Sequence, residues 1–194
     1  MSSTRSKNMN CELKARITEA NIDVVDINGF KFNLHKMEIE TLKDFKILLP
    51  IFSDVSVGDC IVTTDWIISR LGNGNKPVDL CVRVKNFELV PSEGFKPSQY
   101  LNGKVVGMFL NSEKCYLRTV GPDKKPFYMA TIKIRDSFKQ PYAMCLVGFG
   151  NQAKKMSTVK KQSVVECEVT VKPKRDADGY EFAVISLEVI SEVK

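Results

Sequence analysis

The chain lacks the side chains from which most metal sites and catalytic dyads are built. It contains a single histidine, His35, and its six cysteines include no CxxC pair. Structural zinc needs clustered Cys and His ligands, and nucleophilic catalysis needs a base beside the nucleophile. We therefore expect no metal and no cofactor. We also expect the cysteines to be reduced and to pack as small apolar side chains.

The sequence also lacks a glycine-rich phosphate loop and a long apolar run. No segment approaches the roughly 18 consecutive apolar residues that cross a bilayer. Residues 1–10 hold no apolar stretch of the kind found in a secretory signal, so we expect a cytoplasmic protein without a membrane partner. The sequence shows no phosphate loop, no histidine-based dyad and no carboxylate pair at a credible catalytic site. We therefore expect a binding protein and not an enzyme.

Positive charge is concentrated in the second half of the chain. Residues 1–94 contain 12 Lys and Arg against 13 Asp and Glu, a net charge of −1. Residues 95–194 contain 17 against 10, a net charge of +7, and the whole chain carries +6. A basic half favours a polyanionic partner such as nucleic acid, and the alternative is a solvated basic surface.

Alternation of apolar and polar residues predicts a chain made almost entirely of strands. In the first half the alternating segments are 9–17, 30–34, 45–51, 60–68 and 78–84. In the second half they are 104–110, 115–120, 127–135, 142–149, 164–172 and 180–189, so that 127–135 and 142–149 count as the third and fourth strands. The one predicted helix is the short, lysine-rich segment 151–161.

The two halves repeat the same order of elements. Residues 91–98 (PSEGFKPS) have the proline and serine content of a linker, which predicts an N-terminal domain at 1–92 and a C-terminal domain at 99–194. Each half ends in a long hairpin. Short strands, few helices and even turn spacing favour an all-β fold of two tandem five-stranded barrels, since barrel closure removes exposed strand edges.

Four segments of the second half carry a family resemblance. They are 101–107 (LNGKVVG), 127–130 (FYMA), 142–153 (YAMCLVGFGNQA) and the closing hairpin 164–189. In this order they resemble the bacterial single-stranded DNA-binding protein family, whose fold is the five-stranded Greek-key OB barrel. The resemblance covers about half of the chain. The first half shares the strand pattern without the helix, so the resemblance implies two tandem OB folds.

The resemblance implies a function and partners. It implies sequence-independent binding of single-stranded DNA in replication or recombination, through base stacking and Lys or Arg contacts to phosphates. RNA stays open as a ligand, because OB barrels bind both nucleic acids. Family members commonly assemble four OB domains, so a homodimer of this chain is expected, with a monomer as the alternative. Replication or recombination proteins are further expected partners. The competing hypothesis is a tandem OB adaptor that acts mainly through protein contacts.

The candidate binding residues are aromatic and basic side chains of the second half. On segment 127–135, one parity places Phe127, Lys133 and Arg135 on an outer face, which suits stacking and phosphate contact. Tyr142 and Phe149 resemble the family's stacking positions, but their spacing of seven puts them on opposite faces unless a bulge lies near Gly148. The remaining candidates are Lys154 and Lys155 on the helix, Lys172, Lys174 and Arg175 near the hairpin tip, and the pair Tyr116 and Arg118.

Each candidate also has a structural alternative. Phe127 could cap the barrel, and the lysines of the helix could serve solubility alone. Trp66, the single tryptophan, shares a face with apolar neighbours, so we expect it in the core and not against a base.

Overall fold

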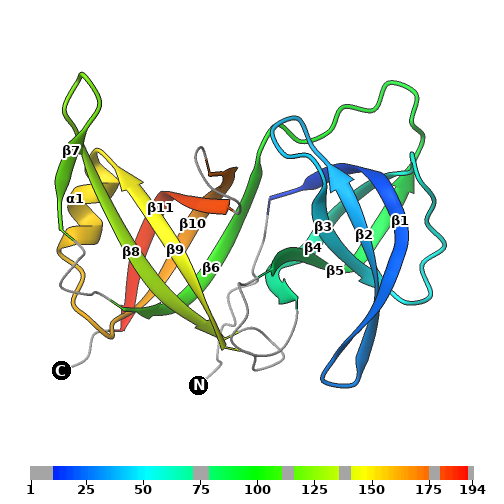
Figure 1. Cartoon of the computed structure of the whole chain (residues 1–194), viewed down its shortest axis with the longest axis horizontal. Coiled ribbons are helices and arrows are strands. Elements are labelled where there is room, and N and C mark those ends of the chain that lie inside the picture. The colour runs from blue at the N-terminus through cyan, green and yellow to red at the C-terminus, as the bar shows by residue number, and fades with distance from the viewer. Residues whose placement is uncertain (1–10, 72–78, 111–115, 136–140, 175–179, 192–194) are drawn as a thin grey trace, which may run out of the picture.

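The computed structural model describes residues 11–71, 79–110, 116–135, 141–174 and 180–191. These residues form two barrels that lie side by side, the first on the right and the second on the left in Figure 1. The first barrel consists of β1 (Leu13–Ile27), β2 (Phe30–Glu38), β3 (Phe45–Pro50), β4 (Cys60–Leu71) and β5 (Asp79–Val90). Its strands pair in the order β1-β2-β3-β5-β4, and contact between β4 and the start of β1 closes it.

The second barrel repeats this strand order. It consists of β6 (Leu101–Phe109), β7 (Arg118–Val120), β8 (Lys125–Arg135), β9 (Pro141–Phe149), β10 (Val164–Pro173) and β11 (Tyr180–Ser191), with helix α1 (Asn151–Ser157) between β9 and β10. The sheet order is β6-β10-β11-β9-β8-β7, and pairing of β6 with β8 closes the ring. In both barrels one pairing is parallel, β3 with β5 and β9 with β11. The predicted all-β tandem architecture is confirmed.

β7 changes the barrel positions that the sequence pattern suggested. Its three residues pair with the start of β8, from Arg118 opposite Phe127 to Val120 opposite Lys125, and so extend a hairpin beyond the barrel. β8 and β9 therefore occupy the second and third barrel positions. Counting them third and fourth was wrong, because a short hairpin extension has the same alternating pattern as a barrel strand.

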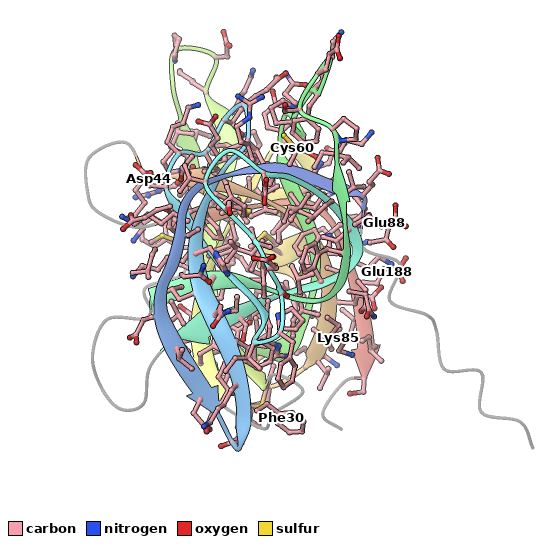
Figure 2. All side chains as sticks on the ribbon, turned by 90° about the vertical axis from the view of Figure 1, so that its right-hand side faces the viewer. Phe30, Asp44, Cys60, Lys85, Glu88 and Glu188 are labelled. Carbon is pink, nitrogen blue, oxygen red and sulfur yellow. The ribbon has the colours of Figure 1, made fainter. Side chains whose placement is uncertain are left out.

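The β1–β2 hairpin projects beyond the closed part of the first barrel. Ile27 pairs with Phe30 at the end of the hairpin, and Figure 2 shows Phe30 at its tip. The Phe30 side chain is 59% exposed. The tip of this arm is therefore exposed, whereas Ile27 and Phe32 below it belong to a small buried cluster with Leu48 and Cys81.

Strand faces follow the predicted alternation. On β8, Tyr128, Ile132 and Ile134 are buried, whereas Met129 and Lys133 are exposed. Successive side chains on a strand point to opposite faces, so apolar residues at every second position give a strand with one buried face. The outer face of β8 is therefore the one predicted from the sequence.

Three cysteines and the tryptophan belong to the core, as expected, whereas Cys11 is exposed and does not pack in the core. Cys60, Cys81 and Cys167 are buried and form no disulfide, and burial raises the pKa of the Cys167 thiol to about 12. Trp66 is 2% exposed, and its indole N–H donates to the carbonyl of Cys11 over 2.9 Å. Base stacking by Trp66 is excluded by this position.

Helix α1 packs across the end of the second barrel. It begins after Gly150, whose φ of +57° favours glycine, and it buries Ala153 and Met156. Gly148 permits this contact, because a Cβ there would lie 3.1 Å from the backbone nitrogen of Ala153. The helix ends earlier than the predicted 151–161. No helix among the described ranges is long and apolar enough to cross a membrane.

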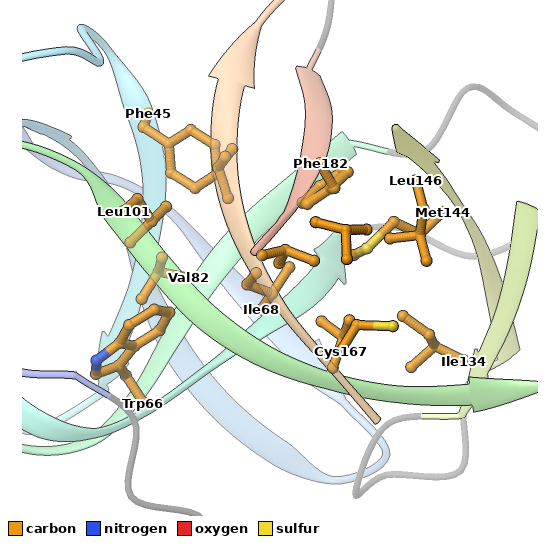
Figure 3. Packing of buried hydrophobic residues seen from close by; sticks show 14 of the residues in the cluster. Phe45, Trp66, Ile68, Val82, Leu101, Ile134, Met144, Leu146, Cys167 and Phe182 are labelled. Atoms are coloured by element: carbon orange, nitrogen blue, oxygen red, sulfur yellow. The ribbon is translucent and has the colours of Figure 1, made fainter. Parts of the chain in front are cut away.

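The two barrels share one hydrophobic core. Figure 3 shows Trp66 and Val82 of the first barrel in the same cluster as Leu101 and Phe182 of the second. A Cβ on Gly103 of β6 would lie 3.0 Å from the Trp66 ring, so the glycine admits the indole. We infer that the relative position of the barrels is held by packing.

The predicted linker is bound to the first barrel. The N–H of Ser98 donates to the carbonyl of Lys14 over 2.8 Å, and the N–H of Lys14 donates to Oγ of Ser98 over 2.9 Å. The hydroxyl of Thr41 donates to the carbonyl of Gln99 over 2.7 Å. These bonds place the next residue, Tyr100, between the barrels. The domain boundaries at residues 92 and 99 stay a prediction.

Candidate nucleic-acid interface

An open cavity of about 1000 Å³ lies where the second barrel meets the linker and the first barrel. We call it the aromatic groove. Three of its side chains are aromatic and two are lysines, and the groove draws on segments far apart in the sequence. Its lining residues are Thr41, Tyr100, Val120, Phe127, Phe149, Val171, Lys172, Pro173, Lys174 and Glu181.

Two predicted aromatic residues contact each other in the wall of the groove. Phe127 of β8 is paired with Phe149 of β9, and their ring centroids lie 5.2 Å apart with the planes tilted by 60°. The guanidinium carbon of Arg118 lies 4.7 Å from the centroid of the Phe127 ring. Phe127 is therefore held between a cation and a second ring. Phe149 is 45% exposed and offers an open aromatic surface.

Tyr116 and Arg118 line a small cavity next to the Phe127–Phe149 pair. Together with Phe127 and Met129 they line a cavity of about 40 Å³. The Tyr116 side chain is 62% exposed. The predicted pair therefore lies beside Phe127, where it extends the aromatic surface along the β7–β8 hairpin.

The predicted cations separate into two groups. Lys172 and Lys174 line the groove next to the tip of the β10–β11 hairpin. Lys133 shares the outer face of β8 with Phe127, but six residues put it about 20 Å further along the strand. Lys154 and Lys155 are exposed on α1 and do not line the groove.

Two predicted basic residues cannot be placed in the interface. Arg175 lies outside the described residues. Arg135 is the last residue of β8, and its side chain lies outside the described part of the chain.

Tyr142 is not a surface residue, so its predicted role was wrong. It is 4% exposed, and its hydroxyl donates to the carbonyl of Ile68 in the first barrel over 3.0 Å. Pairing of β8 with β9 runs without a register shift from Phe127 opposite Phe149 to Ile134 opposite Tyr142. The bulge that would turn both aromatics to one face is therefore absent, and alternation puts Tyr142 inside and Phe149 outside.

Three groove residues were not among the candidates predicted from the sequence. Tyr100 follows a segment with linker composition and immediately precedes β6. Thr41 lies between β2 and β3 of the first barrel, and Glu181 lies near the start of β11. For Tyr100 the sequence offered one hint, an aromatic residue at the end of a linker. The hydrogen bonds of the linker to Lys14 and Thr41 explain why this residue reaches the groove.

The described residues contain no group of three or more His, Cys, Asp or Glu side chains that could hold a metal ion. What the groove presents is aromatic rings beside ammonium groups. Aromatic faces stack on planar rings, and lysines bind phosphate as point charges.

Comparison with known proteins identifies the fold. No protein-family model matches the chain, and no curated protein matches its sequence. Two solved structures of the single-stranded DNA binding protein from Thermus aquaticus are similar over nearly the whole chain. A deletion variant matches with a TM-score of 0.62 and 12% identity over 96% of this chain and 97% of that one.

The wild-type Thermus aquaticus protein matches with a TM-score of 0.61 and 11% identity, over 97% of this chain and 96% of that one. This chain has a tandem OB fold. The resemblance seen in the second half therefore extends, at the level of fold, to the first half as well. At this identity the likeness concerns the fold of the tandem OB chain.

Proposed function

We propose that this tandem OB protein binds single-stranded DNA independently of sequence, in replication or recombination. The observation that carries the proposal is the aromatic groove, which sets Tyr100, Phe127 and Phe149 beside Lys172 and Lys174 in one open cavity. The similarity of fold to a single-stranded DNA binding protein supports it. The protein acts by binding and not by catalysis.

The groove suits unpaired bases for a physical reason. Bases in a duplex are already stacked, whereas bases of a single strand expose their faces to an aromatic ring. Each stacked base contributes about 1–3 kcal/mol. Ammonium groups along the groove bind successive phosphates and release counterions, so the affinity depends on salt. Phe149, the more open ring, is the main platform, and Phe127 is held behind it by Arg118.

The test is a salt-titrated comparison of oligo-dT, oligo-rU and duplex DNA by fluorescence anisotropy, with the oligomer mass measured in parallel. We expect oligo-dT to bind and duplex DNA to bind far more weakly. Each phosphate contact on a single strand adds about −0.7 to the slope of log K against log salt. Absence of oligo-dT binding at low salt would sink the proposal. Equal affinity for oligo-rU would widen it to single-stranded nucleic acid.

A matched pair of variants places the phosphate contacts. The double change Lys172→Gln and Lys174→Gln should lower the magnitude of the salt slope by about 1.4, since each lysine contributes about 0.7. The double change Lys154→Gln and Lys155→Gln removes the same charge from α1, outside the groove. We expect this control to keep most of the slope. A larger loss in the α1 variant would move the phosphate path onto the helix.

The first barrel supports a second candidate function, contact with a protein. Phe52 is 97% exposed and Val57 is 65% exposed in the connection between β3 and β4. The second barrel carries α1 at the corresponding connection. Changing Phe52 and Val57 to Ser should leave DNA affinity intact. If these changes instead dissociate a homodimer in the mass measurement, this surface joins two copies, which would together hold four barrels.

A further inference from the structure

One groove residue has the wrong charge for binding phosphate. Glu181 of β11 lines the aromatic groove and lies opposite Lys172 of β10 in the antiparallel register. Directly opposed residues share a face of the sheet, so the carboxylate and the ammonium face the same ligand space. Among the residues that the structure describes, no hydrogen bond or ion pair joins the Glu181 carboxylate to a neighbour. It is therefore available to a ligand.

A carboxylate in a groove that binds a polyanion lowers affinity unless it contacts something other than phosphate. Like charges repel, and Lys172 and Lys174 beside it would bind phosphates more tightly without it. An ionised carboxylate only accepts hydrogen bonds. In single-stranded DNA the hydrogen-bond donors within the strand are on the base edges, which are unpaired and accessible.

The four bases differ in what they offer to such an acceptor. Cytosine carries an N4 amino group, which donates, at the ring position where uracil and thymine carry the O4 acceptor. A carboxylate near the base edge therefore binds the cytosine amino group and repels O4. Carboxylate acceptance from cytosine N4 is an established mode of base reading.

We propose that Glu181 makes the aromatic groove prefer cytosine to uracil and thymine. Stacking on Phe149 and Phe127 does not distinguish between bases. Glu181 adds selectivity by contacting the base edge next to Lys172. The inference rests on the proposed function, because it needs a single strand in the groove. It deepens that function by naming a residue that determines specificity.

The probes for the test are oligo-dC and oligo-dU of about 16 nucleotides, an upper site size for one OB fold. They differ at the 4-position and share the backbone, and slightly alkaline pH keeps cytosine unprotonated. A good base-edge contact discriminates by about 5- to 150-fold, and we expect the wild type to bind oligo-dC at least fivefold more tightly. In Glu181→Gln the two affinities should become equal, since a carboxamide accepts from N4 and donates to O4.

The matched control is Glu188→Gln. Glu188 is exposed on the same strand and does not line the groove, and its change to Gln removes the same charge. We expect Glu188→Gln to keep the oligo-dC preference. Glu181→Gln should also bind oligo-dU more tightly than the wild type does, because the repulsion of O4 is gone.

The outcomes separate the two proposals. If the wild type binds neither probe at low salt, the proposed function fails and this inference fails with it. If both probes bind equally well and Glu181→Gln changes nothing in their ratio, the function stands and the inference is overturned. If the oligo-dC preference survives in Glu181→Gln, its source lies elsewhere in the groove and the assignment to Glu181 is wrong.

Discussion

The two barrels have the same strand order but differ on the outer face of their second and third strands. In the first barrel this face is closed. Phe32 and Leu48 belong to a small buried cluster there, and the guanidinium carbon of Arg83 lies 5.9 Å from the Phe32 ring centroid. In the second barrel the corresponding strands, β8 and β9, carry Phe127 and Phe149 in an open groove.

The difference shows that the OB backbone sets where a groove can form and the side chains decide whether it opens. Apolar residues that pack on one another close the face of the first barrel. Aromatic residues with lysines beside them leave the second open. The charge balance points the same way, with −1 in residues 1–94 and +7 in residues 95–194. We infer that the second barrel binds nucleic acid and that the first positions the linker and Tyr100 for it.

The largest expected effect on binding comes from removing the two aromatic rings of the second barrel, and it tests the division of roles between the barrels directly. In the double variant Phe127→Ala and Phe149→Ala, each lost ring should cost about 1–3 kcal/mol of binding free energy. This corresponds to a loss of roughly 5- to 150-fold for each ring in oligo-dT affinity, measured by fluorescence anisotropy.

The matched control removes two exposed rings from the first barrel. Phe30 is 59% exposed and Phe52 is 97% exposed, so their change to alanine creates no cavity. We expect oligo-dT affinity to stay within about twofold of the wild type, since these rings lie outside the groove. An equal loss in both double variants would assign binding to both barrels and end the division of roles.

An intermediate effect concerns the joint between the barrels. Tyr142→Phe removes the hydrogen bond from the hydroxyl to the carbonyl of Ile68 and should lower the free energy of unfolding by about 1 kcal/mol. Urea unfolding followed by fluorescence of Trp66 measures this change. Oligo-dT affinity should not change.

Tyr116→Phe is the control for this experiment, because it removes the same hydroxyl from a side chain that is 62% exposed. It should leave the unfolding free energy unaltered. A Tyr142→Phe variant with normal stability and weaker oligo-dT binding would return Tyr142 to the binding surface.

The smallest expected effect is a pH dependence of the first barrel. His35 is fully buried, and its Nδ1 accepts a hydrogen bond from the N–H of Asn21 over 3.2 Å. Nε2 has no partner within the described residues. Burial lowers the His35 pKa from its ordinary value of 6.5, because the charged form would lose hydration.

The direction in which stability changes with pH follows from proton binding by His35. Below pH 6.5 the unfolded chain protonates His35 while the folded chain does not, so stability falls as pH decreases through 6.5 toward the folded pKa. Urea unfolding on both sides of pH 6.5 measures the loss. His35→Asn keeps an acceptor near Asn21 and should show a weaker pH dependence. Identical pH profiles for the wild type and His35→Asn would contradict this expectation.

The sequence predicted the strands and their faces because alternation is a local property. Met129 and Tyr128 are neighbours whose exposure follows from backbone geometry alone. Alternation also showed that Tyr142 and Phe149 point to opposite faces of the same strand, but it did not show which of the two is buried. That choice depends on the hydrogen bond of Tyr142 to Ile68, a residue 74 positions away in the chain.

The sequence by itself determined the tandem arrangement, the outer face of β8 and the location of the basic charge in the second half. These features depend on neighbouring residues and on composition. Only the tertiary structure decided the groove, since Thr41, Tyr100, Phe149 and Glu181 come together through barrel closure and through binding of the linker to the first barrel. Contacts between distant residues depend on how the two barrels pack, and no local pattern records that packing.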